Sequence, residues 1–316
     1  MRRAAGCAAM VALVVAASSA VAQTYPSKPI RILVGPGPDA LARLYGQKFT
    51  EAWGQQIVID QRPGAGGTIA AETVAKAAGD GYTLLLATGS YTINASLQQQ
   101  PYDLVRDFAP ISLLGTVPFI LVVTPSLPAK SVMELIRLAK SRPGAINYAS
   151  AGNGTPPHLA GEMLKMMTGI DIVHVPYKGA AQGLTDVIAG QVQMMFAVGP
   201  VGIPQVQSGK VRGLAVSTAT RSRVVPQLPT VAEAGVPGFE VVGWNGLLAT
   251  AGAPNAALAK LYREIARVTA MPDTQSRIVG FGFEPVASTP EAFGAFMRQD
   301  IARWAKVIRE THVKID

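Results

Sequence analysis

Hydrophobic residues gather in short continuous runs, and longer amphipathic segments separate these runs. The first runs are 30–34, 57–60 and 82–87, and the amphipathic segments between them are 40–53 and 68–78. Continuous apolar runs bounded by glycine and proline indicate strands that are buried on both faces, whereas the longer segments indicate helices. The alternation predicts βαβ units around a parallel sheet, with Asp39 as the N-cap of the first helix.

The same alternation returns after a longer apolar strand at 119–123. Ser131 is expected to cap a helix. The further predicted helices are 132–141, 156–164, 256–271 and 290–310, and the further predicted strands or extended segments are 146–149, 173–175, 192–197, 211–216 and 239–244. The pattern therefore indicates a second α/β unit, followed by helices that have no sheet of their own.

The predicted elements divide into two lobes. Lobe 1 is expected to comprise 23–123 and 243–316, and lobe 2 to comprise 124–242, because the C-terminal helices must return to the first sheet. Two crossings, near Val123 and Val242, then form a hinge that closes the lobes around a ligand. The alternative is a single large doubly wound domain.

The N-terminus reads as an export signal. Arg2 and Arg3 precede an apolar run at 8–17, and Ala20-Val21-Ala22 fits the small-residue rule for cleavage after Ala22. This predicts a signal peptide at 1–22 and a periplasmic location; the alternatives are a membrane anchor or a chance apolar start. Because Cys7 is the only cysteine, the mature chain is expected to lack disulfides and thiolate metal sites.

Charge and motifs narrow the function further. The formal net charge is +8, but the cations are dispersed, which argues against nucleic-acid binding and favours a mild field for anionic solutes. The three histidines have no zinc-site spacing, and no nucleophile elbow of the Gly-x-Ser-x-Gly type occurs. We therefore predict no catalytic residues, no metal and no cofactor. The glycine-rich turns at 35–38 and 64–67 are weak phosphate signals, and tight strand-to-helix turns explain them as well.

Two turns of the second unit are the main candidates for a ligand site. The turn at 150–155 combines small residues with polar side chains and opens a helix, with Thr155 as N-cap and Pro156 at the first helical position. Tyr177-Lys178-Gly179 opens the next helix. Backbone N–H groups at helix starts bind anions, and open α/β sheets hold ligands at their carboxyl edge. These turns predict a small acidic ligand, although capping alone explains them equally well.

Many ordered motifs make the chain resemble a known family. The matching segments are 25–31, 62–67, 78–84, 107–112, 148–152, 175–179, 228–235 and 244–246. They are similar to the Bug-type periplasmic receptors of tripartite tricarboxylate transporters. The resemblance implies a two-lobed periplasmic binding protein of the Venus-flytrap type (type II). Each lobe is expected to be a mainly parallel sheet flanked by helices, and small carboxylates are expected to be held by cleft loops.

The resemblance places four loops at this cleft, at 35–39, 88–91, 150–155 and 177–180. The candidate ligand-binding residues are Gly35, Pro36, Gly37, Asp39, Ser90, Tyr91, Ser150, Gly152, Asn153, Gly154, Thr155, Tyr177, Gly179 and Ala180, with Phe196 as a pocket wall. The loop at 35–39 is several residues shorter than is usual in the family, which predicts fewer amides on that side of the ligand.

Three functions follow from these observations. The leading hypothesis is a monomeric solute-binding protein that captures a small organic carboxylate for a tripartite membrane transporter. A second hypothesis is a binding protein that signals to a two-component sensor kinase. The third is a secreted enzyme, for which Asp39 or His158 would supply the reactive group.

Overall fold

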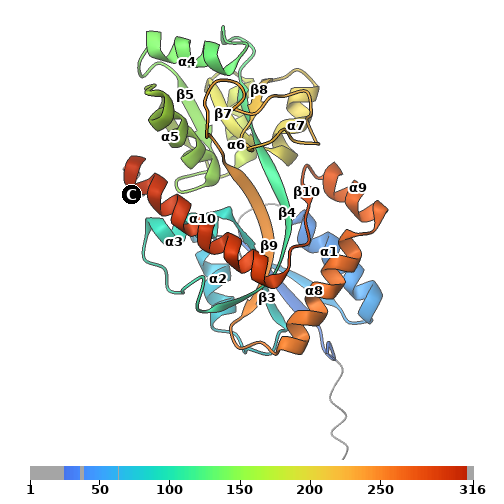
Figure 1. The fold of residues 1–316 in the computed structure, drawn as a ribbon. Helices are drawn as coiled ribbons and strands as arrows, with labels where there is room; N and C mark the ends of the chain where they lie inside the picture. The colour runs from blue at the N-terminus through green and yellow to red at the C-terminus, as the bar shows by residue number, and fades with distance from the viewer. Residues whose placement is uncertain (1–24, 36–38, 63, 312–316) are drawn as a thin grey trace, which may run out of the picture.

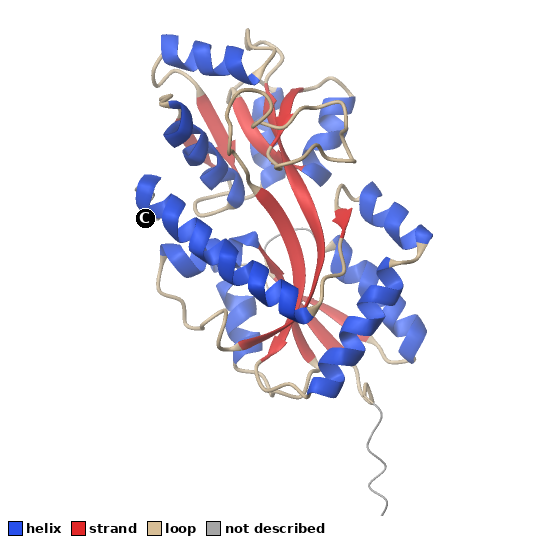
Figure 2. Cartoon of the chain, viewed as in Figure 1, coloured by secondary structure: helices blue, strands red, loops and turns tan. Residues whose placement is uncertain are grey.

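The chain folds into two α/β lobes joined by two long strands (Figure 1). The structure is a computed structural model, and it describes residues 25–35, 39–62 and 64–311. The strands β4 (Phe108–Val123) and β9 (Val242–Thr250) run between the lobes, and helices flank the sheet in each lobe (Figure 2). The prediction of a two-lobed α/β fold is confirmed.

The sheet of the first lobe has the strand order β2-β1-β3-β9-β4, with β10 on the other side of β4. The bounds are β1 Ile30–Val34, β2 Ile57–Gln61, β3 Thr83–Thr88 and β10 Glu284–Pro285. The strands β1, β2 and β3 pair in parallel, and the pairs of β9 with β3 and β4 are antiparallel. Ile30, Ile32 and Leu33 are fully buried, as expected for a parallel strand covered on both faces.

The sheet of the second lobe repeats this plan. The bounds are β5 Asn147–Ser150, β6 Val173–Pro176, β7 Met194–Val198 and β8 Arg212–Val216. The strands β5, β6 and β7 are parallel, whereas β7 and β8 pair antiparallel with β4. Each lobe is thus a mixed sheet, in which a parallel trio of strands meets an antiparallel ladder, rather than the mainly parallel sheet that the resemblance implied.

The strand β4 belongs to both sheets. Its residues 108–118 pair with β9, and its residues 119–123 pair with β7. The sequence pattern predicted only the second part, because Pro110, Gly115 and Pro118 interrupt the first part. The structure accommodates them with register shifts between Pro110 and Ser112 and between Leu113 and Gly115. The result is one strand of 16 residues that connects the lobes.

The helices cover both faces of the sheets. Their bounds are α1 Ala40–Trp53, α2 Thr68–Ala75, α3 Gly89–Leu97, α4 Val132–Ser141, α5 Pro156–Thr168, α6 Ala180–Ile188, α7 Gly199–Gln207, α8 Asn255–Thr269, α9 Pro272–Gly280 and α10 Pro290–Thr311, with a short 3₁₀ turn η1 at Ala65–Gly67. Ser131 caps α4 as predicted, since its hydroxyl accepts a hydrogen bond from the Glu134 amide at 3.2 Å. The short helices α3, α7 and α9 were not predicted. The helices α3 and α7 begin at Gly89 and Gly199, directly after a strand, so no turn sequence separates strand from helix and predicts the helix start.

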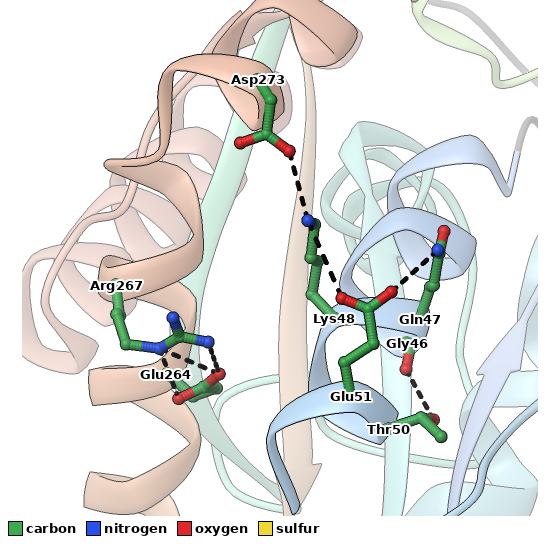
Figure 3. A network of polar contacts seen from close by, with 8 residues as sticks. All are labelled: Gly46, Gln47, Lys48, Thr50, Glu51, Glu264, Arg267 and Asp273. Atoms are coloured by element: carbon green, nitrogen blue, oxygen red, sulfur yellow. Dashed lines mark hydrogen bonds and ion pairs between the residues drawn. The ribbon is translucent and has the colours of Figure 1, made fainter.

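The C-terminal helices α8 and α9 pack on the first lobe beside α1 (Figure 3). The Lys48 ammonium on α1 lies 3.2 Å from the Asp273 carboxylate on α9. Beneath it the buried hydroxyls of Tyr45 and Thr269 are 2.6 Å apart. Exposed ion pairs contribute at most about 1 kcal/mol each, so the burial of apolar residues such as Leu261 accounts for most of this attachment.

The last helix, α10, contacts both lobes. It packs on α3 of the first lobe and on α5 of the second. Trp304 and Val307 belong to one apolar cluster with Ile93 of α3 and Leu159 of α5. The helix α10 thus returns to the first lobe and also contacts the second. Within the described ranges, no helix is long and apolar enough to cross a membrane.

Candidate functional site

Helix starts from the two lobes face one another near the β4 and β9 crossings. In the first lobe α3 begins at the end of β3, and in the second lobe α5, α6 and α7 begin after β5, β6 and β7. A Cβ atom placed at Gly89 of α3 would lie 3.5 Å from the Pro156 ring of α5. The first N–H groups of a helix have no partner within the helix, so the starts of α3 and α6 present donors to an anion. Pro156 and Pro157 at the start of α5 have no N–H.

On the first-lobe side, Tyr91 lies beneath the end of β1. A Cβ atom placed at Gly35 would lie 2.6 Å from the Tyr91 hydroxyl oxygen, so the close approach requires glycine. Tyr91 is 2 % exposed, and its hydroxyl has no hydrogen-bond partner among the described residues. Burial raises the pKa of Tyr91, which keeps the hydroxyl a donor. Pro36 and Gly37, also predicted here, lie outside the described residues.

The turn at 64–67 also reaches this place. Gly66 and Gly67 have φ angles of 63° and 103°, and a Cβ atom at Gly67 would lie 2.7 Å from the Tyr91 hydroxyl oxygen. The Asn94 amide of α3 donates to the Gly66 carbonyl at 3.3 Å. The sequence analysis gave this stretch as a weak phosphate signal that a tight turn explains as well, and it was not among the candidate site residues. The turn follows β2, which pairs in parallel with β1, so the ends of both strands lie at the same edge of the sheet. This shared edge could have indicated that the turn lies at the site.

Asp39 stands at the N-cap position of α1, as predicted, but its side chain does not cap the helix. Its carboxylate accepts hydrogen bonds from Arg43 and from Gln61, each at 2.8 Å, and no side-chain bond to the start of α1 forms. Partial burial opposes ionisation of this carboxyl, but the bonds from Arg43 and Gln61 outweigh it and lower its pKa. The negative charge of Asp39 is therefore neutralised within the first lobe and does not repel an anionic ligand.

The start of α3 is fixed by a buried network that the sequence analysis missed. Asp300 of α10 is 3 % exposed, and it accepts hydrogen bonds from Thr92 at 2.6 Å and from the Trp244 indole at 3.0 Å. The predicted site residue Ser90 is half-buried in the same helical turn. A single acidic residue in an amphipathic helix gives no sequence signal for such a role.

On the second-lobe side, the turn at 150–155 is held by its own hydrogen bonds. Gly152 has a φ of 122° and donates its N–H to the Ser150 hydroxyl at 3.0 Å. The Thr155 hydroxyl donates to the Gly152 carbonyl at 2.7 Å instead of capping α5, which corrects the predicted side-chain cap. The Asn153 side chain is exposed. The N–H groups of Gly154 and Thr155 are also bonded, to His158 Nδ1 and to the Gly152 carbonyl. Asn153 is thus the residue of this turn that can meet a ligand.

The turn after β6 lies next to the turn at 150–155. The Tyr177 amide donates to the Ser150 carbonyl at 3.2 Å, and the Tyr177 hydroxyl donates to Asp186 at 2.6 Å. Burial and the nearby Asp186 charge raise the pKa of Tyr177 to about 12. Gly179 is half-buried, and no atom lies within 4 Å of the position that its Cβ would occupy. The open space at Gly179, beside the first residue of α6, Ala180, leaves room for a ligand.

Phe196 does not line the region between the lobes, contrary to the sequence prediction. Its side chain is fully buried and stacks on Phe239, with ring centroids 5.6 Å apart. In a strand successive side chains point to opposite faces, and the face that Phe196 occupies is covered by the core of the second lobe.

The donors at this site are backbone amides, hydroxyls and amides of side chains. Among the described residues, no three His, Cys, Asp or Glu side chains are grouped so that they could hold a metal ion. A separate cavity of about 580 Å³ is lined by residues 95, 98–106 and 301 at the far end of α3, and it contains none of the predicted site residues. Uncharged N–H and O–H donors of this kind suit an anion.

Comparison with known proteins identifies the family. The sequence model of the tripartite tricarboxylate transporter family receptor matches residues 41–313. The chain belongs to this receptor family. Its members are substrate-binding receptors rather than enzymes, so the prediction of a Bug-type receptor is confirmed.

Close relatives share nearly the full length of the chain. Protein BugT of Bordetella pertussis is 34% identical over 93% of this chain and 92% of its own. Among solved structures, R. palustris Rpa4515 with adipate is 35% identical with a TM-score of 0.86, covering 92% of this chain and 99% of that one. MatC from Rhodopseudomonas palustris with bound malate is 31% identical with a TM-score of 0.81, covering 90% and 100%.

Proposed function

We propose that this chain is a periplasmic receptor that captures a small dicarboxylate between its lobes and delivers it to a tripartite transporter. The observation that carries the proposal is the meeting of helix starts from both lobes, at Gly89 and Pro156, in a member of this receptor family. The starts of α3 and of α6 offer N–H groups, which favour carboxylates, whereas Pro156 and Pro157 of α5 have no N–H to donate. Similar proteins hold adipate and malate, which supports a dicarboxylate of similar size.

The proposed ligand is recognised mainly by uncharged donors. The amides of Asn153, Gly179 and Ala180 and the side chain of Asn153 serve one side, and Ser90, Tyr91 and the start of α3 serve the other. The N–H groups of Gly152, Gly154 and Thr155 are already bonded within the second lobe. Asp39 does not bind the ligand directly, because its carboxylate accepts hydrogen bonds from Arg43 and Gln61. These bonds offset its negative charge, so Asp39 does not repel an anionic ligand. The short 35–39 loop supplies few amides, so we expect more room on this side of the ligand.

Closure of the lobes is proposed to bend the chain at two crossings. The lobes are 23–123 with 243–316, and 124–242. The change of partner along β4, between Pro118 and Phe119, and the start of β9 at Val242 support a hinge at this level. Because α10 packs on both lobes, closure must also slide or bend this helix against α5.

Export and assembly complete the proposal. We infer that residues 1–22, which lie outside the described residues, are a signal peptide cleaved after Ala22, and that the mature receptor is a monomer. Mass spectrometry of protein purified from the periplasm tests the cleavage site, and light scattering tests the monomer. An intact N-terminus in the periplasmic fraction contradicts the first inference.

Calorimetry on the mature protein tests ligand capture. The panel contains malate, succinate, adipate, citrate, an amino acid and an aromatic acid, and native mass spectrometry detects any ligand that co-purifies. We expect Asn153→Ala to weaken dicarboxylate binding about tenfold, the effect of losing one or two hydrogen bonds. Asn255→Ala is the matched control, since Asn255 is an exposed asparagine on α8. Absence of binding across the panel contradicts the proposal.

A transport assay separates a transporter partner from a sensor kinase. Deletion of the gene is expected to abolish uptake of the bound carboxylate, and expression of the receptor is expected to restore it. If uptake is unchanged while a transcriptional response to the carboxylate is lost, the partner is a sensor kinase instead.

A further inference from the structure

Two histidines lie stacked directly beneath the turn at 150–155. His158 on α5 and His174 on β6 have ring centroids 3.9 Å apart and ring planes 11° from parallel. His158 is 5 % exposed. They come from different elements, and the path of β5, α5 and β6 brings them together below the end of β5.

Each histidine contacts one end of the turn. The Gly154 N–H donates to His158 Nδ1 at 3.2 Å, and the Ser150 hydroxyl lies 2.7 Å from His174 Nε2. Gly154 has a φ of 70°, a left-handed conformation that orients its N–H in this direction. The stack therefore fixes the first and the fifth residue of a turn whose exposed residue is Asn153.

The stack itself is held by packing from below. The Tyr148 ring stacks on His174 with centroids 4.9 Å apart, and the Tyr148 hydroxyl donates to Glu162 at 2.7 Å. Gly161 makes room for this ring, since a Cβ atom there would lie 2.3 Å from it. Lys165 pairs with Glu162 at 3.0 Å. Tyr148, His174 and His158 thus form a continuous column of three rings.

Both imidazoles are uncharged at neutral pH. Burial, followed by the charge of Lys165, lowers the pKa of His158 to about 4. Burial, His158 and Lys165 lower the pKa of His174 to about 4, against an opposing effect of Glu162. Since His158 Nδ1 accepts the Gly154 N–H, the neutral ring carries its proton on Nε2. A neutral pair can stack closely, whereas two imidazolium rings would repel.

We propose that His158 and His174 are positioning residues that hold the 150–155 turn in the conformation that receives the ligand carboxylate. This rests on the proposed function of the turn as half of the binding site. The histidines do not touch the ligand; they act through Gly154 and Ser150. Without the stack, the turn would order only on binding, and the free energy of ordering it would weaken affinity.

Matched substitutions separate positioning from simple core packing. An asparagine oxygen can occupy the place of His158 Nδ1, so His158→Asn retains the acceptor for Gly154, whereas His158→Leu fills space without it. In the same way a glutamine oxygen can replace His174 Nε2, so His174→Gln is paired with His174→Leu. The probe is adipate, or whichever dicarboxylate of the panel the wild-type protein binds most tightly.

We expect the leucine variants to bind at least about tenfold more weakly and the asparagine and glutamine variants to stay within about threefold of wild type. Melting temperatures are measured for all four variants. If Leu and Asn at position 158 weaken binding equally, or if binding follows the melting temperature alone, the positioning role is refuted.

Amide hydrogen exchange of the ligand-free protein provides a test that does not depend on the ligand. Exchange of the 150–155 segment is compared with that of the β4 segment 119–123 in the same sample. His158→Leu is expected to speed exchange in the turn about tenfold and to leave β4 unchanged, whereas His158→Asn protects both. Equal protection of the turn in wild type and His158→Leu overturns the proposal.

Two outcomes keep this inference distinct from the proposed function. If no carboxylate binds the wild-type protein but exchange responds as expected, the function is wrong and the positioning role stands. If His158→Leu does not fold, His158→Gln replaces it, because its longer side chain carries the acceptor away from Gly154. Fast exchange in His158→Gln then supports the proposal, and wild-type protection contradicts it.

Discussion

The Glu284 carboxylate on β10 accepts a hydrogen bond from the Ser222 hydroxyl at 2.9 Å, which ties the first lobe to the loop after β8. Glu284 also accepts the Arg223 N–H at 3.2 Å, and Ser222 is 1 % exposed. We expect Ser222→Ala to lower the free energy of unfolding by about 1 kcal/mol, the usual contribution of one hydrogen bond. Urea unfolding measures this change.

The same substitution is expected to loosen the lobes. In small-angle X-ray scattering, Ser222→Ala should increase the radius of gyration of the ligand-free protein, and a saturating dicarboxylate should reverse the increase. Ser276→Ala is the control, because Ser276 is exposed on α9 and bonds only within its helix. An unchanged radius together with unchanged stability would show that the Ser222 bond does not join the lobes in solution.

Gly161 is predicted to be the least replaceable residue of α5. A Cβ atom there would lie 2.3 Å from the Tyr148 ring, within a column of rings that cannot move aside freely. We expect Gly161→Ala to destabilise the protein by about 2 kcal/mol through overpacking. Gly280→Ala is the matched control: Gly280 ends α9, is exposed and has no atom within 4 Å of its Cβ position. There alanine should be neutral or stabilise by up to about 1 kcal/mol.

Urea unfolding of the two glycine variants side by side decides this prediction. If Gly161→Ala is as stable as Gly280→Ala, Tyr148 has shifted, and its stacking on His174 does not constrain the core.

The sequence predicted the elements whose pattern is local. The helix at 40–53 and the strands at 30–34 and 212–216 follow from continuous apolar runs and amphipathic spacing. What it missed depends on partners far along the chain. Residues 108–118 of β4 contain two prolines and a glycine, and they form a strand because β9 lies alongside. The intrinsic strand propensity of residues 108–118 does not depend on this partner and therefore cannot predict the pairing.

The candidate site was predictable at the level of loops but not of atoms. Strand ends that share an edge placed 150–155 and 177–180 together, and the Tyr177 bond to Ser150 agrees with this. The predicted roles of individual side chains were wrong where another hydrogen-bond partner was available. Asp39 and Thr155 both stand at cap positions, yet Arg43 and the Gly152 carbonyl take their polar atoms. The stack of His158 on His174 joins a helix to a strand, and no sequence pattern in either element predicts it.

Stability should fall as the pH drops from about 6.5 to about 4. The pKa of the buried His158 and that of the half-buried His174 are both lowered to about 4, whereas an unfolded histidine has a pKa of about 6.5. In this window the unfolded chain binds more protons, so protonation favours unfolding. A pKa difference of one corresponds to about 1.4 kcal/mol, so we expect a loss on the order of 3 kcal/mol from His158 and a smaller further loss from His174, which is only half-buried. The contribution is fully present above about pH 6.5.

Urea unfolding at pH 4.5 and pH 7 checks this dependence. The double variant His158→Asn with His174→Gln should show a clearly smaller difference between the two pH values. Paired carboxylates such as Asp60 have lowered pKa values and titrate below this window, so they do not mask the effect. Equal pH dependence in the double variant and wild type would mean that other groups cause it.

Asp300 is predicted to couple the start of α3 to α10. It is buried and accepts hydrogen bonds from Thr92 and Trp244, and Arg303 lies 2.5 Å away. Asp300→Ala leaves these donors without an acceptor, and we expect a loss of about 3 kcal/mol in the free energy of unfolding. Asp300→Asn, which retains one acceptor oxygen, should lose less. Near-identical stabilities of the two variants would show that the Asp300 charge and bonds contribute little.

A substitution at Gly179 is expected to change ligand affinity without changing the stability of the fold. Its φ of 174° is ordinary extended backbone, and the space around its Cβ position is open, so Gly179→Ala should change stability by less than about 0.5 kcal/mol. If the start of α6 contacts the ligand, the new methyl group occupies the ligand's space, and dicarboxylate affinity should fall about tenfold. Calorimetry measures this against Gly280→Ala. Wild-type affinity in Gly179→Ala would place the ligand away from α6 and shift the site toward α5 and α7.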